Sequence, residues 1–143
     1  MSTCILCALD LNQPDQSRKL LETAHKLAKL DGAQLDVLSV VPNFGVGEVA
    51  DFFPEDYLEK AMDQARSDLE KFVTEVIGAE ANKSIRHEVA SGKVYQEVLR
   101  VAEAAGSDLI VIGSHKPAIR DYLLGSNASH VVRHAPVSVL VIR

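Results

Sequence analysis

Residues 109–143, LIVIGSHKPAIRDYLLGSNASHVVRHAPVSVLVIR, contain two short apolar runs separated by a loop with glycines and a helical segment. The runs at residues 109–112 and from Val137 to Ile142 are almost continuously apolar, which is typical of strands in a parallel sheet covered on both faces. The residues after Gly125 predict a short helix. A strand, a loop, a helix and a second strand in this order predict a crossover unit of an α/β protein.

The same alternation of strands and helices continues towards the N-terminus. Three more strands are predicted, at residues 5–9, 35–41 and 84–89. Three more helices are predicted, which begin at Ser17, near Glu55 and at Val94. The apolar positions of the first helix include Leu30, and Gly32 follows where a left-handed residue ends a helix. We therefore expect one domain over residues 1–143, an α/β sandwich whose five-stranded parallel sheet is Rossmann-like and has the last strand at its edge.

Composition and charge narrow the class of protein. The 143 residues are 47% hydrophobic and 24% charged, which excludes an intrinsically disordered chain. The net charge of -5 argues against general binding to nucleic acid or to anionic membranes. The first apolar stretch, from Cys4 to Leu9, is too short for a secretion signal or a membrane span, so we expect a cytoplasmic protein.

Cys4 and Cys7 form a C-x-x-C pattern inside the first predicted strand. Residues three apart on a strand point to opposite faces, so the two sulfur atoms cannot join without breaking the strand. We expect both to be buried structural cysteines, with redox or metal binding as the alternative.

The predicted ligand site lies at the carboxyl ends of the strands, where open α/β sheets bind their ligands. Glycines let backbone amides approach phosphate oxygens, and the start of the helix after Gly125 offers unpaired N–H groups. The candidates for phosphate contact after the fourth strand are Gly113, Ser114, His115, Lys116, Gly125, Ser126 and Asn127. Ordinary turn and helix-capping roles are the alternative for these residues.

The spacing of these residues resembles the universal stress protein family over all 143 residues. ATP-binding members carry G-x2-G-x9-G-[ST] between the fourth strand and the last helix, and the tail YLLGSNASHVVRHAPVSVLVIR is similar to the bacterial F/G subgroup. The resemblance implies an adenine nucleotide alpha hydrolase-like fold. It also implies ATP as the ligand, Asp10 at the ribose or at Mg²⁺, and Val40 at the adenine.

One departure from the family pattern concerns Lys116. Gly113 and Gly125 are twelve residues apart where the pattern needs thirteen, and Lys116 stands where the second glycine belongs. Its ammonium group either replaces the lost backbone donor as a point charge or is solvated.

The sequence gives less support to a metal site, a receiver domain or a flavodoxin. His130 and His134 have the i, i+4 spacing of metal ligands, but no third ligand is visible and the HExxH glutamate is absent. A receiver domain would need an acidic pair after the first strand, where Asp10 stands alone, and a flavodoxin would need a glycine-containing phosphate loop there.

We expect an ATP-binding regulatory module with little or no turnover. The alternative is a slow ATPase or an autophosphorylating protein, with Ser114, Ser126 or Ser129 as phosphate acceptor. The apolar run from Val137 to Ile142, predicted at an unprotected sheet edge, also predicts a homodimer through this strand, as the resemblance implies.

Overall fold

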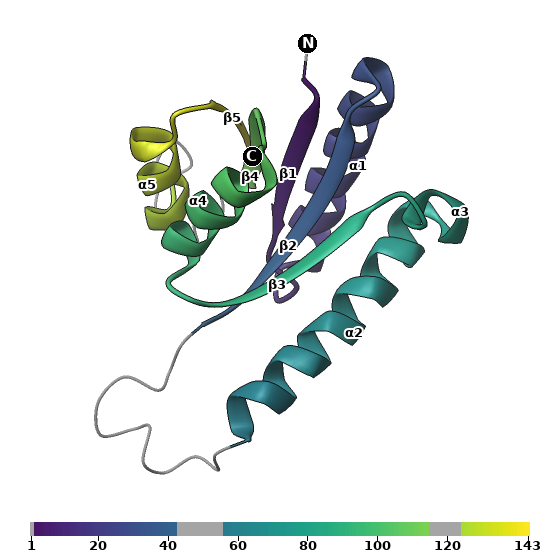
Figure 1. Cartoon of the computed structure of the whole chain (residues 1–143), viewed down its shortest axis with the longest axis vertical. Helices are drawn as coiled ribbons and strands as arrows, with labels where there is room; N and C mark the ends of the chain where they lie inside the picture. Colours follow the sequence, from purple (N-terminus) through teal and green to yellow (C-terminus); the bar gives the residue numbers. More distant parts are fainter. Residues whose placement is uncertain (1, 43–55, 115–123) are drawn as a thin grey trace.

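The computed structural model of the chain describes residues 2–42, 56–114 and 124–143. Within these residues, five parallel strands form one sheet in the order β3-β2-β1-β4-β5 (Figure 1). The strands are β1 (Cys4–Leu9), β2 (Gln34–Pro42), β3 (Arg86–Gly92), β4 (Leu109–Gly113) and β5 (Ser138–Ile142). The helices are α1 (Pro14–Asp31), α2 (Tyr57–Ile77), α3 (Ala79–Asn82), α4 (Val94–Ala105) and α5 (Ser126–His134). The expected parallel α/β fold with the last strand at the sheet edge is confirmed.

Two apolar clusters cover the two faces of the sheet and make it the middle of three layers. Alternate residues of β1 divide between them, because successive side chains of a strand point to opposite faces. Ile5 and Cys7 pack with α1 and α2, whereas Leu6 packs with α4 and α5. Both cysteines are free and buried, as the strand pattern predicts.

The order of the strands indicates where a sheet of this kind binds its ligand. The chain runs from β1 outward to β2 and β3, and then returns to the other side of β1 for β4 and β5 (Figure 1). The direction of winding therefore reverses between β1 and β4, and the connections diverge there at the carboxyl ends of the two strands.

Three local expectations are corrected. The short helix α3 was not predicted, and β3 covers residues 86–92 instead of 84–89. The turn after α3 delays the start of the strand, because the Ile85 amide donates to the Asn82 carbonyl, and pairing with β2 extends the strand to Gly92. Leu30 is 82% exposed and contributes nothing to the core. Gly32 ends α1 with a left-handed φ of 64°, as expected.

None of the helices in the described residues is long and apolar enough to cross a membrane.

Candidate functional site

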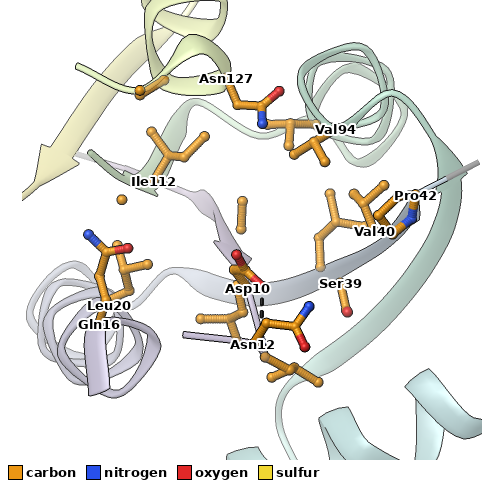
Figure 2. Close-up of a pocket in the computed structure, with 18 of the residues that line it drawn as sticks. Asp10, Asn12, Gln16, Leu20, Ser39, Val40, Pro42, Val94, Ile112 and Asn127 are labelled. Carbon is orange, nitrogen blue, oxygen red and sulfur yellow. Dashed lines mark hydrogen bonds between the residues drawn. The ribbon is translucent and has the colours of Figure 1, made fainter. Parts of the chain in front are cut away.

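A cavity of about 520 Å³ opens at the carboxyl ends of β1, β2 and β4, at the point where the winding reverses. Its wall is formed by the ends of these strands and by the first two turns of α1, α4 and α5 (Figure 2). Helix α2 contributes Ala65 and Asp68. The predicted site residues that line it are Asp10, Val40, Gly113, Gly125, Ser126 and Asn127.

Asp10 stands in the middle of the cavity wall, at the turn between β1 and α1 (Figure 2). One of its carboxylate oxygens accepts a hydrogen bond from the Asn12 amide at 3.0 Å, which is the geometry of an Asx turn. The buried Ser17 hydroxyl donates to the Asp10 carbonyl at 2.7 Å and accepts from the Asp10 amide at 3.0 Å. These contacts fix the backbone, while the exposed carboxylate keeps an oxygen available to a ligand.

The first turn of α5 borders the cavity. Gly125 precedes it in an extended conformation with φ of -64° and ψ of 160°, and the helix has no side-chain cap. The amides of Ser126, Asn127 and Ala128 lie in this first turn and have no carbonyl partner among the described residues. Such amides, together with the positive end of the helix dipole, favour an anion.

The start of α5 is held in place by neighbouring elements. The Gly125 amide donates to the Ser114 carbonyl at 3.2 Å, and the Ser114 amide donates to the Ile142 carbonyl at 2.9 Å. The Asn127 side-chain carbonyl accepts from the Tyr95 amide at 3.2 Å and thereby caps α4. Of the Asn127 side chain, the NH₂ group remains for a ligand.

The opposite side of the cavity is largely apolar. Val40 and Pro42 of β2 lie there, and Val94, at the start of α4 beside Asn127, faces them (Figure 2). Ser39 adds a hydroxyl to this side. An apolar wall facing a group of amide donors suits an amphipathic ligand with an anionic end.

Of the remaining predicted site residues, the structure describes Ser114. Ser114 is 8% exposed and supports the site through its backbone, without lining it. His115 and Lys116 lie outside the described residues, so the shortened loop stays a prediction from sequence.

The sequence pattern missed several lining residues. Asn12 and Gln16 follow β1 within the polar segment LNQPDQ, and their proximity to a strand end was the available signal. Asp68 comes from the middle of α2 and had no signal, because the register of a helix against a sheet is not readable from one sequence. Its carboxylate accepts from the Gln64 side chain at 2.8 Å.

No group of three or more histidine, cysteine, aspartate or glutamate side chains suited to a metal ion occurs in the part of the chain that the structure describes. His130 and His134 instead belong to a stack of rings. The His130 ring stacks on Tyr95 at 4.3 Å between centroids, and its Nδ1 lies 2.7 Å from the Ser126 carbonyl.

Comparison with known proteins supports the resemblance noted from the sequence. The sequence model described as the Universal stress protein family matches residues 1–143. Universal stress protein G of Shigella flexneri is 33% identical over 149 aligned residues, which cover 100% of both chains.

The solved structure of the hypothetical protein MJ0577, from Methanocaldococcus jannaschii, has a TM-score of 0.77 at 24% identity, and the match covers 98% of this chain and 94% of that protein's chain. A universal stress protein in complex with cAMP has a TM-score of 0.63 at 18% identity, with 99% and 97% covered. The chain belongs to the universal stress protein family.

Proposed function

We propose that this protein binds ATP in the cavity and acts as a regulatory nucleotide-binding module with little or no turnover. The observation that carries the proposal is that the cavity has two chemically different sides, an apolar side formed by β2 and the unpaired amides at the start of α5. A nucleobase is flat and largely apolar, whereas a phosphate chain needs hydrogen-bond donors. The two ends of an adenine nucleotide therefore match the two sides of this cavity.

In this arrangement the adenine lies against Val40 and Pro42. The phosphates approach Gly113 and the first turn of α5, where the Ser126 hydroxyl and the Asn127 amide group add donors. Figure 2 shows Asp10 between the two sides, so we place its carboxylate at the ribose.

The same carboxylate suits Mg²⁺. Magnesium is commonly held by one or two carboxylates together with substrate phosphates, and it keeps several waters. Asp10 lines the cavity with a carboxylate, so it would hold the ion at the phosphate chain and help to neutralise its charge.

The structural comparison is consistent with this ligand class. A protein with the same fold, at a TM-score of 0.63, was solved with cAMP, which is an adenine nucleotide.

Calorimetry with Mg-ATP tests the proposal. We expect one ATP per chain, and ligand at a hundred times its dissociation constant should raise the free energy of unfolding by about 2.7 kcal/mol. Asp10→Asn keeps an oxygen for the Asn12 amide but loses the charge, and should weaken Mg-ATP about tenfold. Asp15→Asn is the matched control, since Asp15 lies in the first turn of α1 outside the cavity wall. Absence of both heat and stabilisation at millimolar Mg-ATP would contradict the proposal.

A second candidate function is slow autophosphorylation. The exposed Ser126 lines the cavity beside the proposed phosphate position, whereas Ser114 is buried. Incubation with ATP labelled at the γ-phosphate distinguishes the two functions, because autophosphorylation would leave label on wild-type protein and not on Ser126→Ala.

We also propose a homodimer through β5. One edge of this strand pairs with β4, and the sheet order leaves the other edge without a strand among the described residues. Its apolar side chains, from Val139 to Ile142, remain only partly buried.

A further inference from the structure

Gln16 projects a side-chain amide into the cavity from the first turn of α1 (Figure 2). The residue is half-buried. Neither its amide oxygen nor its amide nitrogen has a hydrogen-bond partner within residues 2–42, 56–114 and 124–143. A carboxamide at a cavity wall with both polar atoms unpaired is available to a ligand.

The position of this amide is tied to Gly113 at the end of β4. A Cβ atom on Gly113 would lie 2.8 Å from the Gln16 Cδ and Oε1 atoms and 3.1 Å from its Nε2. Real Cβ atoms do not approach other atoms this closely, so any larger residue at position 113 would displace the amide. The glycine therefore makes room for the Gln16 side chain as well as for a ligand.

Gln16 lies beside Gly113, one of the residues that the proposed function places at the phosphates. Figure 2 shows Gln16 and Ile112 on one side, Val40 and Pro42 on the other, and Asp10 between them. The neighbouring strand β4 is also the strand that holds the start of α5, through the hydrogen bond from the Gly125 amide to the Ser114 carbonyl.

We propose that the Gln16 side-chain amide donates a hydrogen bond to the phosphate chain and makes the site prefer phosphorylated ligands over the free nucleoside. This inference rests on the proposed function. An amide NH₂ group supplies two donors without a charge, which suits a phosphate oxygen that already faces backbone amides and a metal ion. The contact lies beyond the reach of adenosine, which ends at the ribose.

The test compares Gln16→Glu with Gln13→Glu, using ATP and adenosine in calorimetry. Both substitutions replace an amide by a nearly isosteric carboxylate at the start of α1 and change the net charge equally, but Gln13 lies outside the cavity wall. We expect Gln16→Glu to weaken ATP by tenfold to a hundredfold and to leave adenosine unchanged. Gln13→Glu should change neither by more than about twofold, because position 13 lies outside the cavity wall and its charge is screened by salt. Gln16→Met, which keeps the shape of the side chain without the amide, should also weaken ATP selectively.

Each result has a distinct meaning. If wild-type protein binds ATP and neither Gln16 variant weakens it more than the Gln13 control, the inference about Gln16 is overturned while the proposed function stands. An equal loss of ATP and adenosine on Gln16→Met would also overturn the inference, because it would show that the side chain acts through packing. If wild-type protein binds neither ligand, the proposed function fails and this inference fails with it.

Discussion

Asp36 is a charged residue within the apolar strand β2, and its side chain is 1% exposed. Arg86 reaches it from β3 with two hydrogen bonds, Nε to Oδ1 at 2.6 Å and Nη2 to Oδ2 at 2.8 Å. The Cys4 thiol lies 3.5 Å from the same carboxylate. A buried carboxylate is stable only while charged or hydrogen-bonding partners such as Arg86 remain. The pair therefore stabilises the contact between β2 and β3 at the end of the sheet far from the cavity.

Removing Arg86 should therefore destabilise the protein. Arg86→Ala leaves the Asp36 carboxylate buried without its partner, and we expect a loss of about 2 kcal/mol in the free energy of unfolding. This expected loss is smaller than the loss for a fully buried ion pair, because the Arg86 side chain is 54% exposed and water can reach it. Arg66→Ala is the matched control, since its pair with Asp63 is exposed on both sides and should contribute less than about 0.5 kcal/mol. Equal losses in urea denaturation would contradict the expectation.

The buried thiols predict a loss of stability at alkaline pH. Burial raises the pKa of the Cys7 thiol far above its ordinary range. Burial, followed by the Asp36 charge, also raises the pKa of Cys4. In the unfolded chain a cysteine ionises near pH 8.5, so above that pH the unfolded state releases protons that the native state retains. The free energy of unfolding should then fall as pH rises, by about 1.4 kcal/mol per pH unit for each thiol.

Cys7→Ala isolates the effect of one thiol. We expect the advantage of wild type over this variant to shrink by about 2 kcal/mol between pH 8 and pH 10. Urea denaturation at both pH values measures it, and an unchanged difference would show that Cys7 ionises as readily in the native state.

At the scale of elements, Asn127 links the two helices that border the cavity. It lies in the first turn of α5 and caps the start of α4 by accepting from the Tyr95 amide. Asn127→Asp keeps the capping oxygen but adds a negative charge at the proposed phosphate position. This variant should retain wild-type stability and bind ATP at least tenfold more weakly, with adenosine unchanged. Asn127→Ala should lose about 1 kcal/mol of stability because the cap is removed. Thermal denaturation and calorimetry of both variants check this, and unchanged ATP affinity in Asn127→Asp would contradict the phosphate assignment.

The free edge of β5 predicts the state of assembly. Light scattering at micromolar concentration should give twice the mass of the chain. Val141 is partly buried and lies opposite Ile112 in the register of β4 and β5. A lysine there places a charge on the edge strand, which natural sheets use to prevent pairing. Val141→Lys should therefore be monomeric, and a wild-type monomer would exclude the proposed dimer.

The elements that the sequence predicts well are those with a strong apolar pattern. The sequence predicts strand β4 to within one residue, because the strand is continuously apolar and covered on both faces. Strand β3 was shifted, since its exposed residues Arg86 and Glu88 interrupt the apolar pattern and its length is set by pairing with β2. Helix α3 has one turn and no periodicity to detect.

For the whole molecule, some residues of the candidate site could be predicted from the sequence and others could not. Asp10, Gly113 and the start of α5 could be predicted, because residues that follow parallel strands must meet at one edge of the sheet. Gln16 had only its nearness to the end of β1 as a signal, and Asp68 had none, because its place in the cavity depends on how α2 packs on the sheet.

The central claim is that one nucleotide spans the cavity, with its base at β2 and its phosphates at the start of α5. Backbone amide chemical shifts during a titration test this most directly. ATP should move two separate groups of amide signals, those of Ser39 to Val41 and those of Ser126 to Ala128, with the same apparent affinity. Adenosine should move only the first group. If saturating ATP leaves the signals of Ser126 to Ala128 unmoved, or moves only signals outside the cavity wall, the claim is contradicted.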